Sequence, residues 1–126
     1  MVQLILHLIG DYITQSQWMA NGKTKHSWIA AVHATVYALP FLLIGSWQAV
    51  AGIGISHFFV DRFRFVRFVI FAKNHIGVNF PPLSWEDCKA TGYPSEVPPW
   101  MAVWLMIIAD NTIHLVCNYA ALAVWR

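Results

Sequence analysis

The sequence is poor in charge, since only 11% of its 126 residues are Asp, Glu, Lys or Arg, whereas 58% are hydrophobic. Soluble domains carry about one quarter charged residues, so this chain has too little polar surface to cover a water-facing globule. It also lacks a long basic tract, and its formal net charge is only +2. No nucleic-acid partner is therefore expected. A bilayer is the solvent that this composition predicts.

Cysteine is scarce as well. Cys88 and Cys117 have neither the spacing of a zinc knuckle nor the density of a disulfide scaffold. The N-terminal apolar stretch lacks the basic residues that open a signal peptide, and it carries His7 and Asp11 near its middle. We therefore expect this stretch to be retained as a first helix.

Four apolar stretches predict an all-α protein, an integral membrane bundle of about four transmembrane helices. Each stretch is near or above the ~20 residues that a spanning helix needs. They cover Met1–Trp18, Ser27–Ile44, Trp47–Phe71 and Pro99–Trp125. Residues 1–126 are expected to form one transmembrane domain with an extramembrane, proline-rich loop at about 73–98. The predicted location is a membrane, as a multi-pass protein of the bacterial inner membrane, with membrane lipids as partners.

The positions of Lys and Arg predict the orientation in the membrane. Lys23 and Lys25 follow the first stretch, and the basic residues from Arg62 to Lys73 end the third. Because basic residues collect on the cytoplasmic side, the loop at about 73–98 should be cytoplasmic and both termini external.

Seven ionisable side chains lie inside the predicted spans. Each costs about 2.5 to 3.5 kcal/mol on insertion scales, so such residues are paired and usually functional. They are His7, Asp11, His33, His57, Asp61, Asp110 and His114. Six of them form three pairs separated by four residues, which places both members of a pair on one helical face.

The order within the pairs matches the direction of the helices. The first and third stretches read His then Asp, whereas the fourth, which runs the opposite way, reads Asp110 then His114. The three histidines should therefore lie nearer the external side of the membrane, and the three aspartates one helical turn nearer the cytoplasm. The three pairs can then converge, with His33 joining near the aspartates.

Imidazole and carboxylate groups are typical ligands of Zn, Mn and non-haem Fe, and helical bundles present them as inward-facing pairs. The pattern predicts a divalent metal site, with zinc as the favoured ion and Mn or Fe as alternatives. Two other interpretations stay open. The same residues can form a proton or ion pathway, or can hydrogen-bond only to hold the helices together.

The chain resembles a family of short phage and bacterial membrane proteins that is catalogued as domain of unknown function 3307. The resemblance rests on HLIGDYITQSQWMANGK, AVHATVYALPFLL, SHFFVDRFRFVRF, AKN and DNTIH. A weaker similarity, carried by His7, Asp11, His33, His57 and Asp61, is to membrane-bound metal-dependent hydrolases under a bacterial damage-response repressor. This second resemblance implies a hydrolytic activity.

The function expected from these observations is metal-dependent hydrolysis of a lipid-like or membrane-associated substrate. Asp61 is the expected catalytic base, because it lies next to Arg62, which could hold an anionic head group. The alternatives are a non-enzymatic phage or prophage membrane protein that modifies the host envelope with a structural metal, and a proton or ion pathway. The sequence leaves homo-oligomerisation open.

Overall fold

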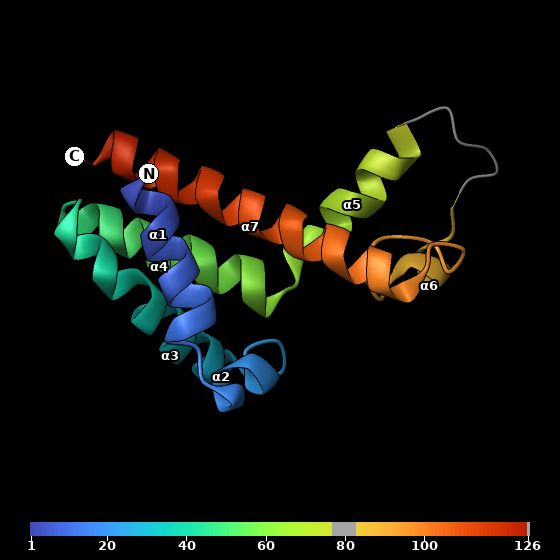
Figure 1. The fold of residues 1–126 in the computed structure, drawn as a ribbon, viewed down its shortest axis with the longest axis horizontal. Coiled ribbons are helices and arrows are strands. Elements are labelled where there is room, and N and C mark those ends of the chain that lie inside the picture. Colours follow the sequence, from blue (N-terminus) through green and yellow to red (C-terminus); the bar gives the residue numbers. More distant parts are fainter. Residues whose placement is uncertain (77–82, 126) are drawn as a thin grey trace. The chain divides into compact units, whose positions relative to one another are not determined.

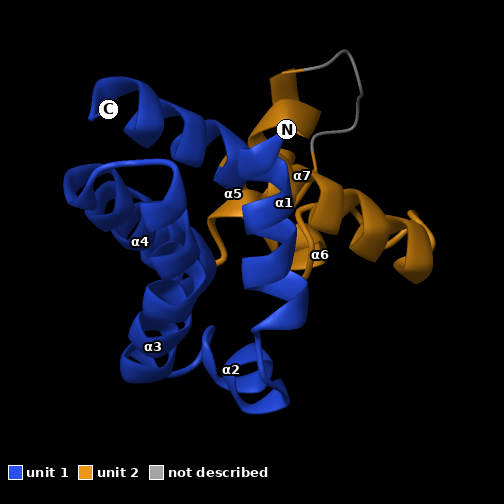
Figure 2. Ribbon diagram, turned by 60° about the vertical axis from the view of Figure 1, so that its left-hand side comes forward, with its two compact units in different colours: residues 1–63, 114–126 blue, residues 64–113 orange. Residues whose placement is uncertain are grey.

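The computed structural model describes residues 1–76 and 83–125, and every regular element in these ranges is a helix. The all-α fold class is therefore confirmed for the described part of the chain (Figure 1). The chain divides into two compact units, coloured separately in Figure 2. Unit 1 consists of residues 1–63 and 114–126, and unit 2 consists of residues 64–113. The single domain over residues 1–126 stays a prediction.

Unit 1 contains most of the helices. In chain order they are α1 (Val2–Leu8), the π-helix η1 (Ile9–Ile13), α2 (Gln17–Gly22), α3 (Ser27–Ala38), the 3₁₀ helix η2 (Leu39–Leu43), α4 (Trp47–Arg62) and the end of α7 (Pro99–Val124). Unit 2 contains α5 (Phe65–Ile76), α6 (Trp85–Cys88) and the first part of α7.

The first expected helix is interrupted twice. It is α-helical to Leu8 and continues as one π-helical segment to Ile13. A new helix then begins after Ser16, whose hydroxyl accepts a hydrogen bond from the Met19 amide at 3.3 Å and so caps α2. The prediction of one continuous helix over Met1–Trp18 was therefore wrong.

The second and third expected helices also differ from the structure at their C-terminal ends. Pro40 has no amide hydrogen, so α3 ends at Ala38 and the chain tightens into η2. The third expected helix ends as α4 at Arg62, because Arg64 adopts a left-handed conformation with φ of 50°. The guanidinium of Arg64 donates to the Ala90 carbonyl at 2.8 Å, which supports this conformation.

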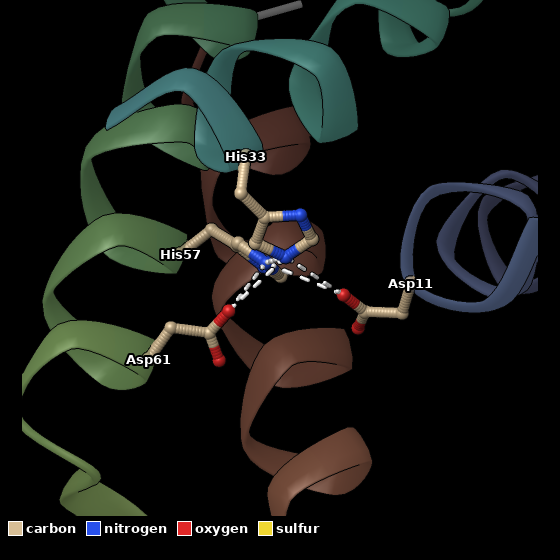
Figure 3. A group of neighbouring side chains, drawn as sticks. All are labelled: Asp11, His33, His57 and Asp61. Carbon is tan, nitrogen blue, oxygen red and sulfur yellow. Dashed lines mark hydrogen bonds and ion pairs between the residues drawn. The ribbon is translucent and has the colours of Figure 1, made fainter. Parts of the chain in front are cut away.

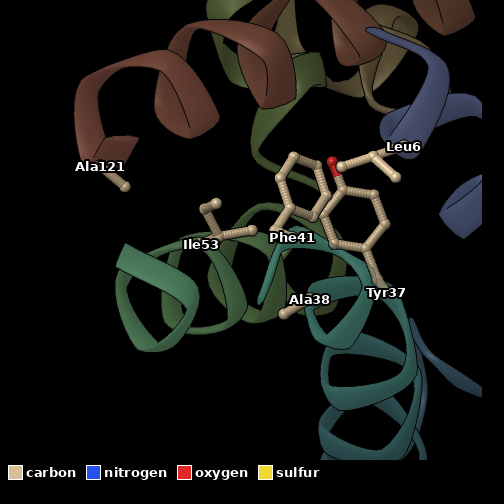
Figure 4. Close-up of a cluster of buried hydrophobic side chains, with 6 residues drawn as sticks. All are labelled: Leu6, Tyr37, Ala38, Phe41, Ile53 and Ala121. Carbon is tan, nitrogen blue, oxygen red and sulfur yellow. The ribbon is translucent and has the colours of Figure 1, made fainter. Parts of the chain in front are cut away.

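The hydrophobic core of unit 1 lies between α1, α3, η2, α4 and the end of α7 (Figure 4). Its buried members are Leu6, Tyr37, Ala38, Phe41, Ile53 and Ala121. The short connection from Ile44 to Ser46 brings α3 back against α4, and these two helices pack closely.

Unit 1 exposes much of its apolar surface. Ile13, Leu43 and Trp47 are 77%, 80% and 71% exposed. Its buried polar side chains are His7, Asp11, His33, His57, Asp61, His114 and Asn118. Charged residues are almost never fully buried in proteins unless they are paired, so the buried aspartates are expected to have partners.

One described helix, α7, is long and apolar enough to cross a membrane by length and composition. The apolar helices over Val2–Ile13 and Ser27–Leu43 are shorter, and α4 has 16 residues. A single helix of this kind does not distinguish a membrane span from a core helix. The bundle of about four transmembrane helices and the multi-pass location therefore stay predictions.

In the segment expected to be an extramembrane loop, at about 73–98, residues 73–76 form the end of α5. The extramembrane location of this segment stays a prediction. Residues 77–82 of this loop lie outside the described residues. The remainder contains α6, which is capped by Ser84 through a hydrogen bond from the Asp87 amide at 3.2 Å.

Candidate metal centre

Four buried side chains meet inside unit 1 (Figure 3). Asp11 comes from η1, His33 from α3, and His57 and Asp61 from consecutive turns of α4. One potential ligand atom from each of the four lies within 4.8 Å of those of the other three. Two imidazoles and two carboxylates from three separate helices therefore converge on one point.

The individual distances within this cluster are short and similar. The Nε2 atoms of His33 and His57 are 2.9 Å apart. Asp11 Oδ1 lies 3.3 Å from the first and 3.4 Å from the second. Asp61 Oδ2 lies 3.1 Å from both.

Two of these separations equal those of ligands around one tetrahedral ion, and the three shortest, of 2.9 and 3.1 Å, lie slightly below them. Ligand atoms bound at about 2.0 to 2.1 Å from zinc lie about 3.3 to 3.4 Å from one another. In the described part of the chain, the buried Asp11 Oδ1 receives no hydrogen bond, and the Nδ1 atoms of His33 and His57 have no hydrogen-bond partner. These four residues could together hold one metal ion.

The ring of His57 is held by aromatic stacking on both sides. The Tyr37 ring lies 3.6 Å away between centroids at 17°, and the His114 ring lies 4.1 Å away at 30°. Because the ring is fully buried between these two neighbours, its Nε2 atom is kept directed at the cluster.

Asp61 contacts several basic groups. Its Oδ1 lies 3.3 Å from His114 Nε2, whereas its Oδ2 faces His33, His57 and the ammonium of Lys23 at 2.8 Å. The side chain of Asp61 is only 5% exposed. Each oxygen of this carboxylate is therefore compensated by a different set of partners.

Lys23 is a site residue that the sequence analysis did not identify, since there it served only as a marker of orientation. Its ammonium lies 2.8 Å from Asp61 Oδ2 and 3.4 Å from His33 Nε2. The only signal in the sequence was its distance of ten residues from His33. That spacing does not indicate a contact unless the turn between α2 and α3 is known.

Tyr37 and Asn118 were also missed. The Tyr37 hydroxyl lies 2.8 Å from His7 Nδ1 and accepts a hydrogen bond from Asn118 Nδ2 at 2.6 Å. His7 Nδ1 is 3.6 Å from Asp11 Oδ2. His7 therefore reaches the cluster through Asp11 and Tyr37.

The π-helical segment places Asp11. In η1 the backbone makes one wide turn, and such segments occur frequently at functional sites. Gly10 lies directly against the Tyr37 ring, so a Cβ atom at this position would collide with that ring. The absence of a side chain at Gly10 lets η1 approach α3 closely enough for Asp11 to reach His33.

The structure brings together Asp11, His33, His57 and Asp61, with His114 and His7 beside them. Asp110 lies in unit 2, one turn before His114 in the sequence of α7, and its role as a ligand stays a prediction. The role of Asp61 as a catalytic base also stays a prediction.

A family described as a protein of unknown function (DUF3307) matches residues 1–86. The chain belongs to the DUF3307 family. No curated protein and no solved structure matches the sequence. The resemblance to this family is thus confirmed, whereas the similarity to metal-dependent hydrolases stays an expectation.

The match covers all four clustered side chains of this DUF3307 protein. Asp11, His33, His57 and Asp61 lie within residues 1–86, as does Lys23. His114 and Asn118 lie beyond the matched residues, on α7.

Proposed function

We propose that this protein is a membrane-embedded protein that binds one divalent transition-metal ion, with zinc as the favoured ion, through Asp11, His33, His57 and Asp61. The observation that carries the proposal is the spacing of their ligand atoms, 2.9 to 3.4 Å for the five separations given above. Two nitrogen and two oxygen donors suit zinc better than ions that prefer six oxygen ligands.

The charges of the centre support the same conclusion. Asp11 and Asp61 are both buried, and like charges at short distance oppose each other's ionisation. A divalent cation would turn these repelling carboxylates into ligands and would keep His33 and His57 neutral.

Metal analysis of detergent-purified protein tests this proposal. We expect about one equivalent of zinc per chain, and a clear loss of metal in Asp11→Asn, which removes one charge with little change in volume. Asp87→Asn is the matched control, because Asp87 is an exposed carboxylate of unit 2. Wild-type protein with far less than one equivalent of any transition metal, and with a melting temperature that chelation leaves unchanged, would refute the proposal.

The exposed apolar residues of unit 1 and the apolar helix α7 support a location in a membrane, for which we propose the bacterial inner membrane. A cysteine-labelling experiment tests the orientation, but Cys88 is a poor reporter because it is buried and burial raises the pKa of its thiol. Glu96→Cys, at an exposed position, in a Cys88→Ala background replaces it. Labelling only after permeabilisation is expected, and labelling in intact cells would overturn the cytoplasmic assignment.

Hydrolysis of a lipid-like or membrane-associated substrate is the activity that we propose for this centre. A bound divalent ion polarises a carbonyl or phosphoryl oxygen and lowers the pKa of a water ligand. In this hydrolytic form of the centre, Asp11, His33 and His57 hold the ion and Asp61 acts as the general base instead of a fourth ligand. The contact of 3.3 Å between Asp61 Oδ1 and His114 Nε2 supports this role.

A structural metal in a non-enzymatic membrane protein is the second candidate function, and the convergence of four protein ligand atoms favours it. Structural zinc sites are closed by four protein ligands, whereas catalytic sites keep one position open. The two candidates therefore differ in whether Asp61 is a ligand or a base.

Cobalt substitution and Asp61→Asn distinguish these functions. In a catalytic centre, azide should change the visible spectrum of the cobalt protein, and Asp61→Asn should retain metal but lose about 100-fold or more in hydrolysis of a p-nitrophenyl ester. In a closed centre, azide has no effect and Asp61→Asn loses metal. Proton or ion flux through liposomes of metal-free protein, dependent on Asp61, would instead support a pathway.

A further inference from the structure

The turn between α2 and α3 is fastened to the end of α4 at two adjacent residues. Arg62 donates from Nη1 to the Thr24 carbonyl at 2.9 Å and from Nε to the Ser27 hydroxyl at 3.0 Å. Asp61, the preceding residue, pairs with Lys23 at 2.8 Å. The Arg62 contacts therefore fix the backbone on the C-terminal side of Lys23 and keep its side chain directed at the cluster.

The Lys23 ammonium contacts two of the four proposed ligand atoms, Asp61 Oδ2 and His33 Nε2. An ammonium group has three N–H donors and no lone pair, so it can only donate to these atoms. The acceptor nitrogen of a neutral imidazole has one lone pair, so His33 Nε2 cannot accept from lysine and bind an ion at the same time. Asp61 Oδ2 has two lone pairs, but an ammonium and a divalent ion on the same oxygen repel each other. Lys23 and the ion thus compete for both atoms.

The charges of the cluster show when the Lys23 ammonium stabilises it and when the divalent ion does. Without an ion, Asp11 and Asp61 place two negative charges in the buried cluster, and Lys23 compensates one of them. A divalent ion compensates both, after which the ammonium is surplus and is repelled by the ion at close range.

Lys23 is also the group that can leave. Its side chain is 18% exposed, compared with 5% for Asp61 and 0% for His33. The lysine stem is long and flexible, so the ammonium can move to water while the backbone of the turn stays in place.

We propose, on the basis of the proposed metal function, that Lys23 is a tethered cation that competes with the divalent ion for His33 Nε2 and for the negative charge of Asp61. It stabilises the centre before the ion binds and is displaced when the ion arrives. Lys23 therefore lowers the affinity for the metal and protects the metal-free fold.

Zinc affinity measured by competition with a chromophoric chelator tests this proposal. Lys23→Met, which keeps the apolar stem and removes the charge, should bind zinc about tenfold or more tightly than wild type. Its melting temperature should be lower than that of wild type when zinc is absent. Lys25→Met is the matched control, because Lys25 is exposed on the same turn, and it should change neither value.

The outcomes separate the two proposals. Equal or weaker zinc binding by Lys23→Met, with wild type still binding zinc, would overturn the role of Lys23 and leave the metal centre standing. Failure of wild type, Lys23→Met and Lys25→Met alike to bind zinc would overturn both.

Amine labelling of the wild-type protein provides a test that does not depend on the folding of a variant. Acetylation of Lys23, followed by mass spectrometry, should increase when zinc is added, because displacement exposes the ammonium. Acetylation of Lys25 should stay constant. Unchanged or decreased labelling of Lys23 on zinc binding would contradict displacement.

Discussion

The two units of this protein use their charged side chains in opposite ways. Unit 1 directs Asp11, Asp61 and Lys23 at one another and at histidines in its interior. In unit 2, Arg64 and Arg67 donate to backbone carbonyls at the surface, those of Ala90 and Lys89. Substitutions of the two groups should therefore have very different consequences.

The physical reason is the cost of burial. A charged group that contacts a carbonyl at the surface keeps part of its water shell, so losing the contact costs little. Removing one partner from a buried charge pair leaves the other uncompensated, which costs about 3 to 5 kcal/mol. Unit 1 thus depends on each member of its cluster, whereas unit 2 tolerates the loss of single contacts.

The largest effect is expected for His57→Ala, because this ring is buried between Tyr37 and His114 and contacts both proposed carboxylate ligands. We expect a destabilisation of about 3 kcal/mol or more together with loss of the metal. Thermal unfolding and metal analysis of the same samples measure both. His26→Ala, at an exposed position of unit 1, is the control. A His57→Ala protein that is stable and still binds the metal would contradict the claim that unit 1 depends on each member of its cluster.

Gly10→Ala should have the next largest effect. The added methyl group would collide with the Tyr37 ring and push η1 away from α3, at a cost of about 1 to 3 kcal/mol and with weaker metal binding. Gly54→Ala is the matched control, since its Cβ would meet Ala38 Cβ at an ordinary 3.4 Å. Alanine is the better helix former, so this control should be neutral or stabilising. Chemical denaturation of both variants checks the expected difference in sign.

Tyr37→Phe separates stability from metal binding within unit 1. It removes a buried hydroxyl that bonds with His7 and Asn118, so we expect a loss of about 1 to 2 kcal/mol. Zinc content should stay unchanged, because this oxygen is not one of the four ligand atoms. Tyr119→Phe, at an exposed position of α7, serves as the control for loss of a hydroxyl. A Tyr37→Phe protein without zinc would place the hydroxyl in the metal centre itself.

The smallest effect is expected in unit 2, from Asp87→Asn. Hydrogen bonds from Ser95 hold the pKa of Asp87 below its usual value of about 3.9. A carboxylate with a lowered folded-state pKa contributes stability above its unfolded pKa and loses it as the pH falls through the folded value. Acid unfolding followed by tryptophan fluorescence should therefore become slightly less steep below about pH 4 in the variant. A large change, or one near neutral pH, would show that the stability of unit 2 also depends strongly on a single charged side chain.

The sequence predicted the clustered residues better than it predicted the helices that carry them. Ionisable side chains in apolar stretches indicate convergence because they have no other means of compensation. This reasoning named seven residues, four of which, Asp11, His33, His57 and Asp61, lie together in the structure. The predicted helices were too long, because the α-helices of the structure end at Leu8, Ala38 and Arg62. A π-helical segment, a proline and an arginine in the left-handed conformation cause these ends, and the apolar pattern does not reveal them.

By itself, the sequence determined the helical fold class, the family, and the side chains that require compensation, because apolar composition and the spacing of His and Asp are local properties of the chain. Only the tertiary structure decided which atoms meet. It directs Asp11 Oδ1 at His33 and His57, and it aligns Lys23 with Asp61. These pairings depend on the close approach at Gly10 and on the turn that Arg62 fastens. Such contacts follow from packing between distant segments, which no periodicity along the chain encodes.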